Sequence, residues 1–175
     1  KNLIIELLNS GVSTKSILVV TDSRGVDYFE DLNLEIIKKD FFISKNGVLG
    51  YLKNLSSFIR IGVELLRELK EKNVKIIFTT GAYVAPYAAL ISLLIGSQLF
   101  IQEQNKYAGL GNKIASYFPS TVFTSFPETK NIREKNIIVT GPVLNINLIK
   151  TESRKSNQDF TIGIQGGSQG SDEIN

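Results

Sequence analysis

The sequence predicts an α/β fold with a Rossmann-like parallel sheet, and two observations lead to this prediction. Short runs rich in β-branched and aromatic residues alternate with amphipathic helical patterns, which is typical of a parallel sheet covered by helices. Polar or glycine-containing turns follow several of the expected strands, and open α/β sheets bind their ligands at such strand ends. The chain has 175 residues, of which 42% are hydrophobic and 21% charged, so it can bury one sizeable core.

The expected elements alternate along the chain. The first residues are expected to lie in a helix that ends near Gly11, because glycine suits the left-handed position after a helix. Further helices are expected at residues 51–70, 86–95 and 110–117. Strands are expected at residues 16–21, 34–38, 74–79, 98–102, 121–124 and 136–140.

The pattern changes after residue 149, where we expect a domain boundary. Residues 1–149 form one Rossmann-like domain in this interpretation, and the polar residues 150–159 form a linker. Residues 160–175 then begin a second Rossmann-like domain with a strand and a glycine loop.

Composition excludes several kinds of chemistry. The sequence has no cysteine and no histidine, which removes disulfides, thiolate nucleophiles and the usual general base. A base within these residues would have to be a carboxylate, a lysine or a tyrosine. No stretch reaches the roughly 18 apolar residues of a membrane span, and no signal peptide opens the chain, so we expect a cytoplasmic or peripheral protein.

Three strand ends carry candidate binding residues. Gly166-Gly167-Ser168-Gln169-Gly170 follows the last expected strand, where backbone N–H groups at a helix start suit a diphosphate. Gly81-Ala82-Tyr83 and Gln102-Glu103-Gln104-Asn105 follow two central strands, and their hydroxyl, amide and carboxylate groups suit a sugar. Each segment alone could equally be an ordinary turn.

Taken together, these segments resemble the MurG family of UDP-N-acetylglucosamine transferases. The family pattern runs Gly-Gly-Tyr, His-Glu-Gln-Asn, Gly-Leu-Thr-Asn-Lys, Gly-Asn-Pro-Val-Arg and Gly-Gly-Ser-Gln-Gly. The corresponding stretches here are residues 81–83, 102–105, 109–113, 141–145 and 166–170.

The resemblance implies the N-terminal acceptor domain of a GT-B fold, followed by the start of the UDP-sugar domain. It implies inverting transfer of N-acetylglucosamine from UDP-N-acetylglucosamine to the muramoyl 4-hydroxyl of lipid I, which forms lipid II. UDP-N-acetylglucosamine is then a substrate, with no cofactor and no metal. The implied roles are catalytic for Glu103 and Tyr83, acceptor-binding for Gly81, Ala82 and Tyr83, and donor-binding for Asn105, Gly166, Gly167, Ser168, Gln169 and Asn175.

Several positions depart from the family pattern. Ala82 stands in place of a glycine, Gln102 in place of a histidine, and the arginine after Gly141 has no clear counterpart. The family's first strand and its Gly-x-Gly-Gly-His loop, which carries the general base, are expected before Lys1. Most of the UDP-binding domain is expected after Asn175, so we expect these residues alone to be inactive.

Residues 38–75 suggest contact with a membrane. They hold nine basic residues against four acidic ones, and Lys53, Arg60 and Arg67 share one stripe of the helix at 51–70. Apolar residues flank this stripe on both sides, which suits an anionic membrane surface. The family resemblance implies that this surface is the cytoplasmic face of the bacterial inner membrane. A solvated helix edge is the alternative. Nucleic-acid binding is a poor interpretation, because aromatic residues do not interleave with the basic ones.

Two other functions stay open at this point. A glycolipid-forming glycosyltransferase of the same fold is one, although residues 102–105 and Asn112-Lys113 favour peptidoglycan synthesis. The other is a sugar-nucleotide-binding protein without turnover. A dinucleotide oxidoreductase is least favoured, because no G-x-G-x-x-G fingerprint is present.

Overall fold

The computed structural model describes residues 1–40, 47–133 and 136–143, and within them the side chains of residues 47–55 are not described. These residues all belong to the first of two units, Lys1–Leu144, into which the chain divides. The expected linker at 150–159, the strand at 160–165 and the glycine loop at 166–170 therefore lie outside the described part.

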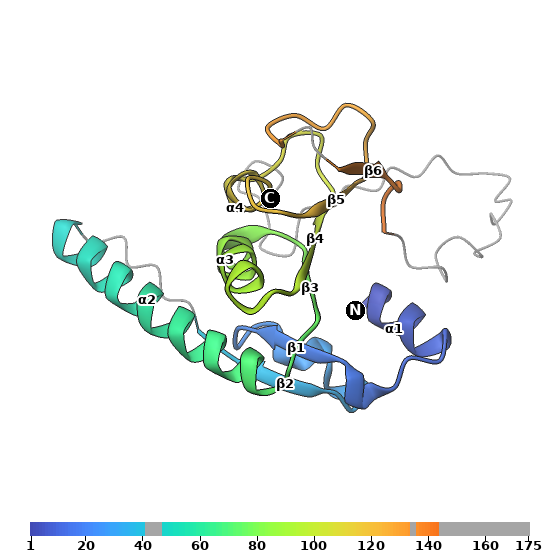
Figure 1. Cartoon of the computed structure of the whole chain (residues 1–175), viewed down its shortest axis with the longest axis horizontal. Helices are drawn as coiled ribbons and strands as arrows, with labels where there is room; N and C mark the ends of the chain where they lie inside the picture. The colour runs from blue at the N-terminus through green and yellow to red at the C-terminus, as the bar shows by residue number, and fades with distance from the viewer. Residues whose placement is uncertain (41–46, 134–135, 144–175) are drawn as a thin grey trace, which may run out of the picture. The chain divides into compact units, whose positions relative to one another are not determined.

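The described strands are all parallel, as the sequence predicts (Figure 1). They form two hydrogen-bonded ladders rather than one continuous sheet. β1 pairs with β2, and the larger ladder has the order β3-β4-β5-β6. The strands are β1 (Leu18–Thr21), β2 (Glu35–Lys38), β3 (Ile76–Thr79), β4 (Gln98–Glu103), β5 (Thr121–Thr124) and β6 (Ile137–Val139).

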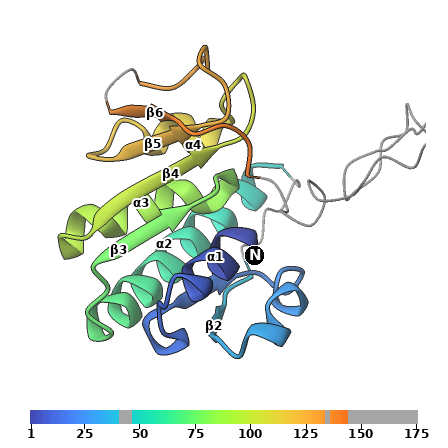
Figure 2. The same cartoon turned by 90° about the vertical axis from the view of Figure 1, so that its right-hand side faces the viewer.

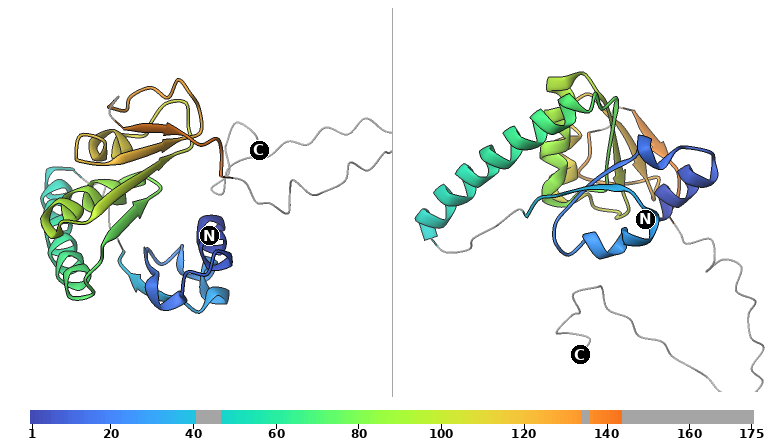
Figure 3. Two further views of the ribbon diagram at one scale, coloured as in Figure 1. Left: turned by 45° about the vertical axis from the view of Figure 1, so that its right-hand side comes forward. Right: turned by 90° about the horizontal axis from the view of Figure 1, so that it is seen from below.

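Of the four α-helices in the described part of the chain, three cover one face of the strands. α2 (Gly47–Glu71), α3 (Ala85–Ile95) and α4 (Leu110–Ala115) lie on this face, and α1 (Asn2–Asn9) lies on the other side (Figures 2 and 3). α2 begins four residues before its expected start. The expected start lies where the apolar periodicity of the sequence begins, and the helical backbone extends beyond it. Short 3-10 turns, which the sequence does not predict, occupy Thr14–Ser16, Val26–Tyr28, Glu30–Leu32 and Ala82–Val84.

Two hydrophobic clusters form the core, and α3 contributes to both. One cluster joins β2, α2 and α3 through Ile37, Ile61, Leu65, Leu69, Tyr87 and Ile91. The other lies between α3, α4 and the larger ladder and contains Ala85, Ala89, Leu99, Ile101, Ala115 and Val122. The two ladders are therefore connected by helix packing, since they share no strand pairing among the described residues.

Lys39 fastens the end of β2 to α2. Its Nζ lies 2.7 Å from Glu68 Oε1 and 3.0 Å from Glu64 Oε2, two carboxylates one helical turn apart. The hydrogen bond to Glu68, with a smaller contribution from Glu64, raises the pKa of Lys39 above its usual value. This pairing helps to place the carboxyl end of β2, which lies beside the carboxyl end of β1.

Candidate active site

The turn after β3 packs directly against the start of α4. Gly81 has φ 106° and Ala82 has φ 56°, both in the left-handed region that favours glycine. A Cβ on Gly81 would lie 2.8 Å from Nδ2 of Asn112, and one on Gly111 would lie 1.8 Å from the carbonyl oxygen of Ala82. Both glycines are therefore required by this close approach, while the methyl group of Ala82 points to an exposed position.

Tyr83 connects this turn to the turn after β1. Its hydroxyl donates a hydrogen bond to Asp22 Oδ2 at 2.6 Å. Arg24 donates from Nη2 to the same hydroxyl at 3.1 Å, and it donates from Nε to Asp22 Oδ2 at 3.0 Å. The strongest of these bonds, from Arg24 and then Tyr83, lower the pKa of Asp22 to about 2. Burial, followed by the bond to Asp22, raises the pKa of Tyr83.

Glu103 ends β4 and is 3% exposed. Its Oε1 accepts the backbone N–H of Asn105 at 2.9 Å. Its Oε2 accepts the side-chain amide of Asn112 at 2.9 Å and the backbone N–H of Gly109 at 3.3 Å. The carboxylate thus holds together the end of β4, the following loop and the first turn of α4.

The other polar residues of this segment differ in exposure. Gln104 and Asn105 are exposed, whereas Gln102 is buried. Nε2 of Gln102 and Oδ1 of Asn112 are buried atoms that find no hydrogen-bond partner among the described residues. Of the predicted donor-binding residues in the described part, Asn105 therefore presents an accessible side chain at a strand end.

These contacts bring five predicted site residues together at the carboxyl ends of β1, β3 and β4. Gly81 packs against Asn112, and Ala82 packs against Gly111. The hydroxyl of Tyr83 donates to Asp22. Asn112 donates to Glu103, which also accepts the backbone N–H of Asn105. The sequence predicts a turn at Asp22 and Arg24 that resembles the family's, but it assigns these two residues no role and does not predict the internal bonds of Asn112. The predicted residues Gly166, Gly167, Ser168, Gln169 and Asn175 lie outside the described residues.

Comparison with known proteins identifies the family. Residues 3–124 match the Glycosyltransferase family 28 N-terminal domain. The chain belongs to this family. A relative from Thermotoga sp. (strain RQ2) is 35% identical over 134 residues, covering 73% of this chain and 38% of the relative. Its name is UDP-N-acetylglucosamine--N-acetylmuramyl-(pentapeptide) pyrophosphoryl-undecaprenol N-acetylglucosamine transferase.

Two further comparisons agree with this family 28 assignment. A transferase of the same name from Caldicellulosiruptor saccharolyticus is 27% identical over 99% of this chain and 47% of its own length. The crystal structure of Acinetobacter baumannii MurG matches 81% of this chain and 40% of that chain, with a TM-score of 0.62 and 24% identity, and so supports the fold. The resemblance to the MurG family is thereby confirmed, although the chain spans less than half the length of these relatives.

The basic helix of this family 28 domain has two distinct apolar sides. Ile61, Leu65 and Leu69 are buried in the core, as expected for the side that faces the sheet. Ile59 and Val63, on the other side of the Arg60–Arg67 stripe, are 57% and 41% exposed. Apolar side chains on the second side of the helix are therefore exposed and are not buried in the core of the described residues.

Exposed leucines on α3 extend this apolar character. α3 is apolar around most of its circumference, yet Leu90, Leu93 and Leu94 remain exposed. α2 and α3 cover the same face of the strands (Figure 1), and the ring of Phe58 lies 3.9 Å from that of Tyr87 between them. Exposed apolar residues in such numbers are typical of surfaces that contact a partner or a lipid.

Only part of the expected basic charge is available on this surface. Lys39 forms ion pairs with two glutamates, and Nζ of Lys72 lies 2.5 Å from Oε1 of Glu35. Arg60 and Arg67 are exposed and form no ion pair within the described part of the chain. None of the described helices is long and apolar enough to cross a bilayer.

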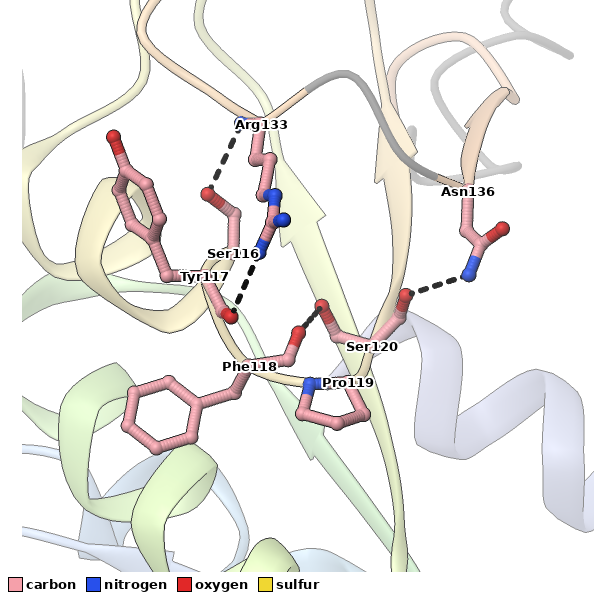
Figure 4. Close-up of a pocket in the computed structure, with 7 residues that line it drawn as sticks. All are labelled: Ser116, Tyr117, Phe118, Pro119, Ser120, Arg133 and Asn136. Carbon is pink, nitrogen blue, oxygen red and sulfur yellow. Dashed lines mark hydrogen bonds between the residues drawn. The ribbon is translucent and has the colours of Figure 1, made fainter.

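A small cavity of about 220 Å³ lies at the amino ends of β5 and β6, away from the strand ends just described (Figure 4). Its polar groups mostly bond to one another. Arg133 donates from its backbone N–H to Ser116 Oγ at 3.1 Å and from Nη1 to the carbonyl of Tyr117 at 3.3 Å. These bonds anchor the loop before β6, and the cavity adds nothing to the candidate site.

Proposed function

We propose that this chain is the acceptor-domain part of an inverting glycosyltransferase that makes lipid II. In the proposed reaction, N-acetylglucosamine moves from UDP-N-acetylglucosamine to the muramoyl 4-hydroxyl of lipid I. The observation that carries the proposal is the match to transferases named for this reaction along 73% of the chain. The contacts of Asn112 with Gly81 and Glu103 support it, because they bring two of the family-like segments together at the carboxyl ends of β3 and β4.

The chemistry assigns separate tasks to the parts of the protein. The 4-hydroxyl oxygen attacks the anomeric carbon, the bond to the diphosphate oxygen breaks, and UDP leaves. The base that takes the hydroxyl proton is expected on the loop before Lys1. Ser168 and the glycines 166 and 167, with Gln169 and Asn175, are proposed to bind the donor, where backbone N–H groups offset diphosphate charge without a metal or cofactor.

Within the described residues, we assign Glu103 to organising the site. Its two carboxylate oxygens already accept three hydrogen bonds from the protein, and the side chain is buried. Such a carboxylate is poorly placed to take a proton from a sugar. Its proposed contribution to catalysis is to hold the loop that presents Asn105 to the donor sugar.

We further propose that α2 brings the acceptor domain to an anionic membrane surface, the cytoplasmic face of the bacterial inner membrane. A lipid-linked acceptor requires this approach. The exposed apolar residues Ile59 and Val63 support it. They lie beside Arg60 and Arg67, which form no ion pair with another described residue, and such a surface suits lipid headgroups.

Transfer by the full-length protein tests the proposal. The protein is incubated with UDP-N-acetylglucosamine and either a lipid I analogue or diacylglycerol, and products are identified by mass spectrometry. We expect a mass increase of one N-acetylhexosamine on the lipid I analogue alone. Transfer to diacylglycerol would favour the glycolipid alternative. UDP-N-acetylglucosamine binding without any transfer would favour a binding protein.

A further inference from the structure

The turn after β1 holds an arginine in a defined orientation beside Tyr83. Arg24 is bound through both Nε and Nη2 to Oδ2 of Asp22, at 3.0 and 2.5 Å. Its backbone N–H also donates to Oδ1 of the same carboxylate at 3.1 Å. Paired contacts of this kind restrict a guanidinium more than a single ion pair does.

The two partners of this ion pair differ in exposure. The side chain of Asp22 is 14% exposed and that of Arg24 is 68% exposed. Nη1 of Arg24 has no hydrogen-bond partner among the described residues. The carboxylate is thus enclosed, while one donor group of the guanidinium remains directed to solvent at the sheet edge.

Tyr83 cannot supply the same kind of contact. A phenol has one hydroxyl hydrogen, and Tyr83 donates it to Asp22. While that bond holds, the hydroxyl cannot donate to a ligand. Arg24 is therefore the group in this trio that can donate hydrogen bonds to oxygen atoms of a bound molecule.

Local charge indicates which oxygen atoms these are. Asp40 accepts hydrogen bonds from the backbone N–H of Ser23, at 2.8 Å, and from its hydroxyl. Lys38 is close enough to Asp40 to help lower the pKa of that carboxyl, after the larger effect of the Ser23 bonds. The charges of Asp22 and Asp40 are balanced by those of Arg24 and Lys38. A region with no net positive charge suits neutral hydroxyl or carbonyl oxygens better than a diphosphate.

We infer that Arg24 binds the saccharide of the acceptor through hydrogen bonds to neutral oxygen atoms, and that Asp22 is a positioning residue that orients Arg24 and Tyr83 for this contact. The inference rests on the proposed function for the identity of the ligand. It assigns a direct ligand contact to the turn after β1, which otherwise only bonds to Tyr83.

Steady-state kinetics of the full-length protein test the inference. We expect Arg24→Gln and Asp22→Asn to lower kcat/KM for a lipid I analogue by about 10- to 100-fold, the usual effect of losing hydrogen bonds to a charged group. The KM for UDP-N-acetylglucosamine should change by less than about twofold. Arg24→Lys should recover only part of the activity, because it keeps the charge and loses the planar fork.

A matched control separates this effect from general loss of a surface ion pair. Glu35→Gln removes the pair that Glu35 forms with Lys72 at the opposite end of β2 from Asp40, and it should leave both substrates' constants unchanged. Unchanged acceptor kinetics in Arg24→Gln, or equal loss toward both substrates, would overturn the inference. Thermal unfolding of each variant identifies any that fail to fold.

A second measurement does not depend on catalysis. The spectroscopic titration of Tyr83, taken as the difference between the parent protein and Tyr83→Phe, should show a raised pKa that falls in Asp22→Asn. An ordinary pKa for Tyr83 in the parent protein would overturn the positioning role of Asp22. If the parent transfers no sugar, the proposed function fails, and this titration still decides whether Asp22 orients Tyr83.

Discussion

The side-chain amide of Asn112 donates to Glu103 Oε2 at 2.9 Å and to the carbonyl of Gln102 at 3.1 Å, so that one residue of α4 holds the end of β4. Both Asn112 and Glu103 are at least nine-tenths buried. A buried carboxylate of this kind is stable only while its hydrogen bonds are made. The site therefore depends on interactions inside the domain as well as on residues that face a ligand.

Glu103→Gln should destabilise the protein. Glutamine has one acceptor oxygen in place of two. Its NH₂ group would face N–H groups that now donate hydrogen bonds to the carboxylate. We expect the free energy of unfolding to fall by about 1–3 kcal/mol. Urea denaturation measures this change, with Glu128→Gln on an exposed side chain as the control. Equal stability of the two variants would contradict the organising role of Glu103.

Gly111→Ala tests the close contact between α4 and the turn after β3. Alanine normally favours a helix over glycine. Here its Cβ would lie 1.8 Å from the carbonyl oxygen of Ala82, so one of the two elements must move. We expect a loss of about 1–3 kcal/mol in the free energy of unfolding.

Gly109→Ala is the matched control for this substitution. Apart from its two chain neighbours, no described residue has an atom within 4 Å of the position that its Cβ would occupy, and its φ of −65° is accessible to alanine. The thermal unfolding midpoint should therefore remain close to that of the parent protein. A Gly111→Ala variant as stable as Gly109→Ala would show that the two elements are not in tight contact.

The sequence predicts each described strand and α-helix, because the apolar periodicity and the turn residues are local signals. It does not predict that β1 and β3 belong to separate ladders, since strand pairing depends on contacts between distant residues. The same limit applies to the site. Tyr83 and Glu103 follow strands and can be found from their positions. The bond between Asp22 and Tyr83 joins residues 61 positions apart and is visible only in three dimensions.

The interaction of Asp22 with Arg24 and Tyr83 should make stability depend on pH in the acid range. The pKa of Asp22 is lowered from 3.8 to about 2 by these hydrogen bonds. Its contribution is therefore present above pH 4 and is lost as the pH falls toward 2. The difference in free energy of unfolding between the parent protein and Asp22→Asn should shrink across this interval. Urea titrations at pH 2, 3, 4 and 6 measure it, and a constant difference would count against the lowered pKa.

Asn105→Ala should weaken use of the donor in the full-length protein. The exposed side chain lies at the strand end held by Glu103, and its amide is proposed to bind the donor sugar. Losing one neutral hydrogen bond costs about 0.5–1.5 kcal/mol, which corresponds to a several-fold rise in the KM for UDP-N-acetylglucosamine. Gln104→Ala, in the neighbouring exposed position, is the control. Unchanged kinetics for both substrates would remove Asn105 from the site.

The last prediction concerns the membrane surface. Replacing Lys53, Arg60 and Arg67 with glutamine should weaken binding to anionic vesicles by up to about 3 kcal/mol, or roughly a hundredfold, since each basic residue near an anionic leaflet contributes about 1 kcal/mol. The loss should be larger at low salt, where the charges are less screened. Replacing Lys15, Lys106 and Lys130 removes the same charge elsewhere and should have a smaller effect. Co-sedimentation with vesicles of increasing anionic lipid content measures both variants. If they bind equally well, or if the parent protein ignores lipid charge, then Arg60 and Arg67 are only the solvated edge of α2.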